Sequence, residues 1–316
     1  MTAALKPSVV RVRTPATCAN LGPGFDALGL ALALHDEITV RVTDGGVTVR
    51  VTGEGAGELP TGRDHLVVRA MDAAFDLLGH RPPGLALDCV NRIPQARGLG
   101  SSSAAIVGGI LLARALVADG ARRLDEAGAL RLAAELEGHP DNVAPCLLGG
   151  FTIAWTQPDG ARAVRLDPHA GLRPVVFVPG ERGLTATARA ALPAAVPHAD
   201  AAANVGRTAL LVHALTAAPA YLFVATEDRI HQEYRAAGMP ETAALVAQLR
   251  CSGVPAVVSG AGPSVLVLGE REWAPPCPAG WIVQPLPVDW TGAGIVGIPG
   301  IVEHAEQDAV AAGPAS

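Results

Sequence analysis

The sequence has 316 residues, of which 49% are apolar and 17% are charged, and its mean hydropathy is +0.31. Such a chain can bury the core of one large domain or two ordinary ones, which excludes a disordered or low-complexity scaffold. The net charge of −6 argues against a nucleic acid or an anionic membrane as the main partner. Lys6 is the only lysine, which excludes a P-loop NTPase and a pyridoxal phosphate enzyme, since both need a lysine in the site.

Cysteine usage and hydropathy predict a cytoplasmic protein. The five cysteines are scattered and form no CxxC pair, so neither a disulfide framework nor a structural zinc site is expected. The N-terminal residues contain no long apolar run typical of a signal peptide. The richest apolar stretch, 106–118, is interrupted by Arg114 and is too short to span a bilayer, so no membrane segment is expected.

The first half of the chain alternates predicted strands and helices. Strands are predicted at Val9–Arg13, Glu37–Val42, Val47–Val51 and Leu85–Val90, and helices at His65–Leu78, from Ser101 to about Val117, and from Asp125 toward Glu137. The turn formers Asp44, Gly45 and Gly46 predict a hairpin between the second and third of these strands.

Beyond Gly149 and Gly150 the pattern indicates an alternating α+β series. Strands are predicted at Phe151–Trp155, Ala163–Leu166, Pro174–Val178, Ala256–Ser259, Val265–Leu268 and Trp281–Pro285, and helices at Thr185–Leu192, Ala199–Leu215 and Glu241–Leu249. We expect a domain boundary near 166–173, which gives domains of residues 1–168 and 169–302 and a disordered tail over 303–316.

The most informative segment is the glycine- and serine-rich run from Pro94 to Ala105. Gly98 and Gly100 allow the backbone to turn its N–H groups outward where a helix begins at Ser101. A helix N-terminus with unpaired donors and a partial positive charge is an anion site, and the serines offer hydroxyls to a phosphate or a magnesium ion. The same residues also fit an ordinary glycine loop with Ser101 as the helix cap, so this segment alone leaves both interpretations open.

Two further glycine-rich segments accompany this loop, Asn20–Asp26 near the start of the chain and Ser259–Ser264 near its end. Three such segments in this order resemble the motifs of the GHMP kinases, the galacto-, homoserine, mevalonate and phosphomevalonate kinases. Four segments resemble the homoserine kinases among them: Ala19–Asp26, Glu137–Pro145, Thr185–Arg189 followed by Leu-Pro, and Asp228–Arg235. The similarity runs from about Ser8 to Ile295.

The resemblance implies an α+β, two-domain GHMP kinase fold, with an N-terminal domain like domain 2 of ribosomal protein S5 and a ferredoxin-like C-terminal domain. It implies ATP-dependent phosphorylation of L-homoserine to O-phospho-L-homoserine in threonine biosynthesis, with ATP and Mg²⁺ as cofactors and a homodimer as the assembly. One alternative is a GHMP kinase that acts on another small alcohol, such as mevalonate or an amino-acid analogue. Another is a non-catalytic ligand sensor on the same scaffold.

The substrate-binding residues that the resemblance implies suit a small zwitterion. Asp26 and Asn20 would hold the ammonium, and Arg189 and Arg235 would hold the carboxylate through paired donors. Thr185 lies one helical turn before Arg189 and so shares its face. Mevalonate has no ammonium for Asp26 to bind. The structural alternatives are that the arginines are solvated helix residues and that Asp26 only stabilises a turn.

For the nucleotide, the resemblance implies a phosphate loop and a magnesium site. The loop residues are Pro94, Gln95, Ala96, Arg97, Gly98, Leu99, Gly100, Ser101, Ser102, Ser103 and Ala104. Ser102 and a helix glutamate are expected to hold the metal. Glu135 and Glu137 are two residues apart and point to different faces of the helix. The surrounding sequence favours Glu135, with Glu137 as the alternative.

Asn142, Asp141 and Arg189 are the catalytic candidates. The resemblance implies that Asn142 orients the acceptor hydroxyl while the proton passes to phosphate. A carboxylate at Asp141 could also accept this proton, so its role as a base stays open. His139 precedes Pro140 in a turn and is interpreted as a structural hydrogen-bonding residue. His65 stands where the family commonly has asparagine, near the adenine pocket, which leaves the preference for the nucleotide base open.

Overall fold

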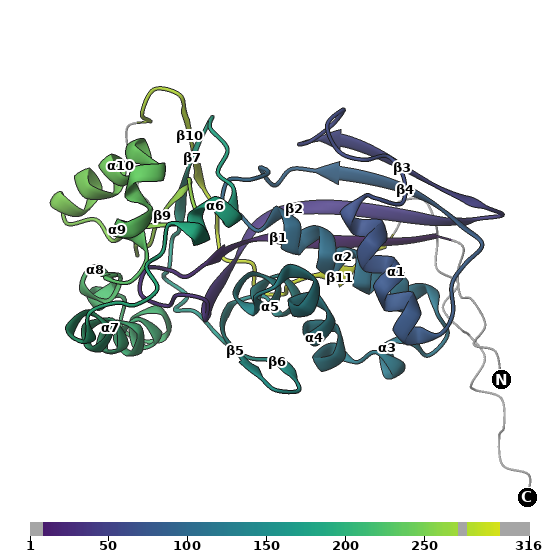
Figure 1. Cartoon of the computed structure of the whole chain (residues 1–316), viewed down its shortest axis with the longest axis horizontal. Coiled ribbons are helices and arrows are strands. Elements are labelled where there is room, and N and C mark those ends of the chain that lie inside the picture. The colour runs from purple at the N-terminus through teal and green to yellow at the C-terminus, as the bar shows by residue number, and fades with distance from the viewer. Residues whose placement is uncertain (1–8, 271–276, 298–316) are drawn as a thin grey trace, which may run out of the picture.

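The computed structural model describes residues 9–270 and 277–297. Within these residues the strands form two β-sheets, one of seven strands and one of four, which lie side by side along the long axis of the molecule (Figure 1). No helix in the described part is long and apolar enough to cross a bilayer. Lys6 and the tail expected over 303–316 lie outside the described residues.

The N-terminal sheet is built around two long strands. Its strands are β1 (Val9–Ala19), β2 (Leu28–Thr43), β3 (Gly46–Gly53), β4 (Gly84–Asn91), β5 (Phe151–Gln157) and β6 (Gly160–Leu166), joined by β11 (Gly294–Ile295). The central order is β11-β1-β2-β4-β3, and β5 pairs with one end of β2 and with β6. Within the two predicted segments, Val10 and Val12 of β1 and Ile38 and Val40 of β2 point into the core in alternation, as the sequence predicts. Residues 14–19 and 28–32, which extend these strands and were not predicted, are buried without alternation.

The predicted hairpin between β2 and β3 is wrong, because β4 lies between these strands and pairs with both. β3 and β4 run parallel, so the chain crosses over through a helix before β4 begins. Gly84 makes this insertion possible. A Cβ atom on Gly84 would lie 2.4 Å from the carbonyl carbon of Gly45, so β4 starts directly against the turn after β2.

Five helices gather on one side of this sheet: α1 (Leu66–Leu78), α2 (Ser101–Leu116), α3 (Gly120–Arg123), α4 (Glu126–Glu137) and α5 (Pro140–Leu148) (Figure 1). Helix α2 is buried on nearly all sides, and a Cβ on Gly109 would lie 2.5 Å from the Val67 carbonyl oxygen of α1. Helix α5 was not predicted, because Pro140 was interpreted only as a stop. It occupies the first helical turn instead, where its missing N–H needs no partner.

The C-terminal sheet has the order β10-β7-β9-β8, and all its pairs are antiparallel. Its strands are β7 (Val175–Pro179), β8 (Ala256–Val258), β9 (Val265–Val267) and β10 (Trp281–Pro285). Its helices are α6 (Thr185–Ala190), α7 (His198–Thr216), α8 (Leu222–Ala225), α9 (Gln232–Arg235) and α10 (Pro240–Cys251), with 3₁₀ turns at Pro219–Tyr221 and Ala236–Gly238. The predicted strands and the three predicted helices are present here, whereas the single-turn helices α8 and α9 were not predicted.

After β10 the chain returns to the N-terminal sheet. The Asp289 backbone N–H donates to the carbonyl of Ala31, and Ile295 of β11 pairs with Val12 of β1. The expected boundaries assign these residues to the second domain, 169–302, yet β11 extends the sheet of the first. The two halves of the molecule are therefore joined by two chain crossings.

Candidate active site

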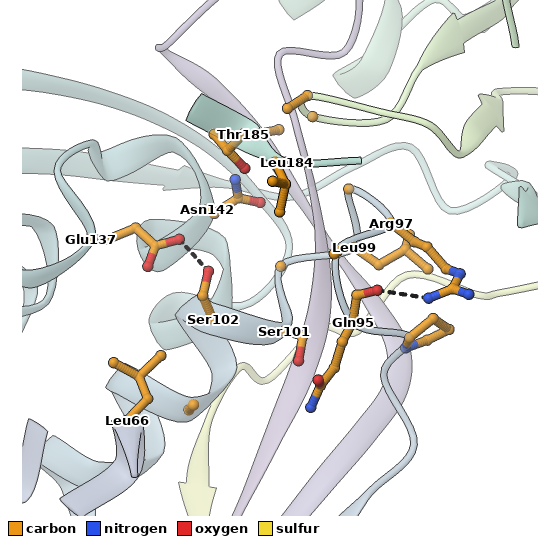
Figure 2. Close-up of a pocket in the computed structure, with 18 of the residues that line it drawn as sticks. Leu66, Gln95, Arg97, Leu99, Ser101, Ser102, Glu137, Asn142, Leu184 and Thr185 are labelled. Carbon is orange, nitrogen blue, oxygen red and sulfur yellow. Dashed lines mark hydrogen bonds between the residues drawn. The ribbon is translucent and has the colours of Figure 1, made fainter. Parts of the chain in front are cut away.

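A cavity of about 430 Å³ lies between the two halves of the molecule (Figure 2). Most of the residues predicted for the site line it: Asn20, Asp26, Pro94 to Ser102, Asp141, Asn142, Thr185, Arg189 and Arg235. Ser103 and Ala104 lie just behind the wall, because both are fully buried in α2. Glu135 is the predicted site residue that lies elsewhere.

The phosphate loop adopts the conformation that its glycines permit. Gly98 and Gly100 have φ angles of +70° and +71°, in the left-handed region that glycine tolerates best. Gly100 rather than Ser101 is the residue before helix α2, and no side chain caps the first N–H groups of that helix. These donors remain available to an anion at the mouth of the helix.

The three glycine-rich segments meet at this loop. The Ser259 hydroxyl donates to the Gly98 carbonyl at 2.5 Å, and Gly260 N–H donates to the Ala19 carbonyl at 3.1 Å. A Cβ on Gly98 would lie 2.1 Å from the carbonyl oxygen of Ser259, so only glycine allows this approach. Cys18 touches the Ser259 hydroxyl, and burial raises the pKa of its thiol to about 12, which keeps it protonated.

Glu137, not Glu135, faces the phosphate loop. The hydroxyls of Ser102 and Ser103 donate to the same Glu137 carboxylate oxygen at 2.6 and 3.0 Å, and Figure 2 shows Glu137 and Ser102 turned toward each other. Glu135 is exposed and lines a separate cavity with Arg131. The geometry therefore does not support the preference for Glu135, because residues two apart on a helix point in different directions.

The residues at the start of α5 form the acceptor end of the cavity. Asn142 accepts a hydrogen bond of 2.8 Å at its amide oxygen from the Thr17 hydroxyl. Asp141 is buried, and one of its carboxylate oxygens lies 2.6 Å from Nδ1 of His139. This hydrogen bond raises the pKa of His139, which agrees with its interpretation as a hydrogen-bonding residue.

Asp26 and Arg189, expected at opposite ends of a substrate, bind each other. Both terminal nitrogens of Arg189 donate to the two carboxylate oxygens of Asp26 at 2.9 Å each. This hydrogen-bonded pairing raises the pKa of Arg189. Both arginine guanidinium groups lie over the Phe25 ring, with distances to its centre of 5.8 Å for Arg189 and 5.3 Å for Arg235.

Arg235 is the buried member of the two arginines. Its Nε donates to the Ala188 carbonyl at 3.1 Å, and Nη1 donates to the Gly260 carbonyl at 3.3 Å. Burial lowers the pKa of Arg235. Asn20 also has a holding role, since its amide nitrogen donates to Gly260 and its amide oxygen accepts from the Asp26 N–H. The site is thus fixed by contacts between segments far apart in the chain.

Three residues in or beside the cavity were not predicted from the sequence: Thr17, Phe25 and Asp36. Thr17 contacts Asn142 across 125 positions, so no local spacing could reveal it. Phe25 is part of a recognised motif, but its stacking under two arginines depends on the folded arrangement. Asp36 lines the cavity from β2, and burial raises its pKa to about 6 against two backbone hydrogen bonds that lower it. Its position within a strand gave no signal of a site.

Comparison with known proteins identifies the class to which this fold and site belong. Residues 65–150 match the family model described as the GHMP kinases N terminal domain. A crystal structure of homoserine kinase from Cytophaga hutchinsonii superposes with a TM-score of 0.75 at 25% identity, and covers 92% of this chain and 98% of that one. A putative homoserine kinase from Listeria monocytogenes gives a TM-score of 0.70 at 29% identity, over 92% and 100% of the two chains. The fold is that of a GHMP kinase.

The curated relatives narrow this class. The homoserine kinase of Streptomyces coelicolor is 56% identical over 93% of this chain and 96% of its own length. That of Clavibacter michiganensis is 57% identical over 83% of each chain. The chain belongs to the homoserine kinase family.

Proposed function

We propose that the protein phosphorylates L-homoserine with ATP to give O-phospho-L-homoserine and ADP, a step of threonine biosynthesis. The observation that carries this proposal is the convergence, in one cavity, of an anion-binding helix start with a carboxylate and two arginines. The helix start suits a triphosphate, and the carboxylate with the two arginines suits a zwitterion. The names of the relatives support the same substrate.

ATP is held through the backbone of the phosphate loop. No lysine lies at the loop among residues 9–270 and 277–297, so the N–H groups at the start of α2 would meet the phosphate charge, together with Mg²⁺. Ser102 and Glu137 fit such an ion, because both present oxygen atoms beside the loop and magnesium prefers oxygen ligands with several waters. The ion would supply neutralisation of the phosphate charge. We assign these two residues, in place of Glu135, as its ligands.

L-Homoserine binds by exchange with an existing ion pair. Its ammonium takes the place of Arg189 at Asp26, and its carboxylate is received by Arg189 and Arg235. Each charged group then keeps a partner of opposite sign, which limits the desolvation cost. Asn20 fixes Asp26 through its backbone, and Thr185 contributes a hydroxyl from the same helix as Arg189. Mevalonate has no ammonium that could take the place of Arg189 at Asp26.

In the reaction, the side-chain oxygen of L-homoserine forms a bond to the γ-phosphorus while the bond from that phosphorus to the β–γ bridging oxygen breaks. Asn142 orients this oxygen, and Arg189 contributes positive charge. The hydroxyl proton passes either to a phosphoryl oxygen or to Asp141, whose second carboxylate oxygen has no hydrogen-bond partner within the described residues. Asp141→Asn separates the routes: a fall in kcat of about 100-fold or more marks a base, and a near-normal kcat marks transfer to phosphate.

We propose that the enzyme acts in the cytoplasm and that it assembles as a homodimer. All five cysteines are free, as expected in a reducing compartment. The homodimer follows only from the family and is tested by sedimentation equilibrium of the purified chain.

A coupled assay of ADP release tests the function. L-Homoserine, L-threonine, L-serine and mevalonate are compared at equal concentration with ATP and Mg²⁺. We expect kcat/KM to be at least about 100-fold higher for L-homoserine than for mevalonate, which lacks the ammonium. A preference for mevalonate would identify the alternative GHMP kinase activity. ATP binding without turnover of any small alcohol would identify a ligand sensor.

A further inference from the structure

The buried Thr17 side chain contacts the catalytic candidate Asn142, and neither a motif nor the family resemblance assigns a role to Thr17. Thr17 is fully buried in β1, and its hydroxyl donates a hydrogen bond of 2.8 Å to the amide oxygen of Asn142. We propose that Thr17 is a positioning residue that holds the Asn142 side chain in place, in an arrangement that turns its NH₂ group toward the acceptor hydroxyl. The role of Asn142 at that hydroxyl rests on the proposed function.

Thr17 is itself held rigidly. Its backbone N–H donates to the Leu99 carbonyl of the phosphate loop at 3.0 Å, and β1 pairs with β2 at Ala31. A β-branched side chain in a strand has few rotamers, so the direction of its hydroxyl is well defined. Thr17 thus contacts the phosphate loop through its backbone and Asn142 through its side chain.

The phosphate loop lies against this hydrogen bond. A Cβ on Gly100 would lie 1.9 Å from the Thr17 hydroxyl oxygen and 3.3 Å from the Asn142 amide oxygen, so the loop backbone lies directly against the pair. A flipped amide would turn its oxygen into the cavity, while its NH₂ group could still donate to the Thr17 hydroxyl.

The chosen orientation has a chemical consequence. With the oxygen engaged by Thr17, Asn142 offers the cavity a hydrogen-bond donor, and Figure 2 shows the amide nitrogen on the side of Thr185. A donor binds one lone pair of the acceptor oxygen and leaves the hydroxyl hydrogen free to turn toward phosphate or Asp141. The flipped amide would instead accept that hydrogen and direct it away from both.

A double-mutant cycle tests the proposal. Thr17→Val keeps the shape but removes the hydroxyl, and Thr17→Ser restores it. For L-homoserine we expect Thr17→Val to lower kcat about 10-fold, with KM and the Kd of ATP changed less than about threefold, and Thr17→Ser to recover most of the rate. In an Asn142→Ala background, Thr17→Val should have no further effect, because the residue through which it acts is gone.

Thr14→Val is the matched control. Thr14 is equally buried in β1, but its hydroxyl has no hydrogen-bond partner within the described residues. We expect its substitution to leave kcat unchanged. If Thr17→Val lowers kcat by the same factor with and without Asn142, or if Thr14→Val matches it, Thr17 serves only the strand and the proposal is overturned.

A readout without turnover separates this proposal from the proposed function. The side-chain NH₂ signals of Asn142, assigned by their loss in Asn142→Ala, are recorded by NMR in the ATP complex. One sharp pair is expected in wild type and Thr17→Ser, and a broadened or doubled pair in Thr17→Val. Unchanged signals in Thr17→Val overturn the proposal. Absence of L-homoserine turnover with the expected NMR pattern overturns the proposed function alone.

Discussion

Asp26 and Arg189 form a bidentate ion pair at the position where we propose that a zwitterion binds. Both side chains are partly exposed, 35% and 46%, so water screens the pair and it can open at modest cost. Arg235 differs because it is buried and held by backbone carbonyls. We therefore expect Arg235 to be the fixed half of the carboxylate site and Arg189 the half that exchanges partners.

Arg235→Leu tests the carboxylate site. Losing one charge-assisted contact whose partner stays buried costs about 2–5 kcal/mol, so kcat/KM for L-homoserine should fall roughly 30-fold or more. Calorimetry should find the ATP affinity nearly unchanged. A homoserine ester, which lacks the carboxylate charge, should lose far less on the same substitution. Equal losses for the acid and the ester would mean that Arg235 serves the fold or the phosphates.

Glu137→Gln tests the magnesium site, with Glu135→Gln as its matched control on the same helix. The amide keeps the shape of the carboxylate but lacks its charge, so the Mg²⁺ concentration for half-maximal rate should rise roughly 10-fold or more in Glu137→Gln. Glu135 is exposed and does not line the cavity, so its substitution should leave the titration unchanged. The reverse result would restore Glu135 as the ligand.

Asp36 gives the stability a defined pH dependence. Burial raises its pKa to about 6 from 3.8, against lowering by the backbone N–H groups of Ile93 and Arg92. Between pH 4 and 6, Asp36 keeps its proton in the folded state but has lost it in the unfolded state. Its contribution to the unfolding free energy is therefore fully present below pH 4 and is lost as pH rises through 6. The loss is about 3 kcal/mol at most.

Asp36→Asn removes this titration while its amide oxygen can still accept both backbone hydrogen bonds. Urea denaturation of both proteins at pH 4 to 7 gives the difference in unfolding free energy. We expect the wild type to lose stability relative to Asp36→Asn across this range, with a plateau above pH 6. A constant difference would show that Asp36 does not change its protonation on folding.

Helix α6 carries two of the proposed substrate residues and buries no side chain. Polar contacts hold its segment over the cavity: Arg189 with Asp26, Ala188 with Arg235, Gly183 with Ala96 at 2.7 Å, and Arg182 with Glu58 at 2.6 and 3.1 Å. A helix attached in this way has a low free energy of local opening, which suits an element that admits a substrate.

Glu58→Gln tests this attachment. Removing the charge opposite Arg182 should accelerate hydrogen exchange of the amides at 183–191, while those of α2 exchange as in wild type. L-Homoserine should slow the exchange of the same segment in both proteins, because its carboxylate would join Arg189 of α6 to the buried Arg235. If exchange at 183–191 does not respond to Glu58→Gln, the pair contributes nothing to holding the helix.

Helices and strands were predicted correctly where the local sequence pattern determines them, and the prediction failed where pairing between distant segments determines the structure. Helices α1 and α2 follow from apolar spacing and their glycine ends. The position of β4 between β2 and β3 depends on a close approach at Gly84, which no local pattern contains. The motif residues that line the cavity were predicted from short local motifs and the family resemblance that they carry. Thr17, and the pairing of Asp26 with Arg189, were missed, since each contact joins segments more than 100 positions apart.

The whole molecule depends on the segment that returns from β10 to the N-terminal sheet. Asp289 anchors it: one carboxylate oxygen lies 2.6 Å from Nε2 of His35, and the other accepts from the Thr291 and Gly292 N–H groups. Asp289 is only 6% exposed, so water cannot replace these partners. Asp289 therefore stabilises the packing of the returning segment on the N-terminal sheet, and this segment connects the two halves of the molecule.

Asp289→Ala should lower the unfolding free energy by about 1–3 kcal/mol, because it leaves buried N–H groups unpaired. Asp289→Asn can still accept these hydrogen bonds and should cost less. Chemical denaturation followed by near-ultraviolet circular dichroism measures both. An alanine variant as stable as the asparagine variant would contradict the anchoring role.

The late position of β11 has a consequence for synthesis on the ribosome. Its partner β1 is among the first strands made, and one end of it stays open at the sheet edge until β11 emerges. Elongation at ~5–20 residues per second puts roughly 6–26 s between the completion of β6 and the arrival of β11. An unpaired strand edge can capture another chain, so the nascent protein passes through a period of exposure to aggregation that the finished fold does not reveal.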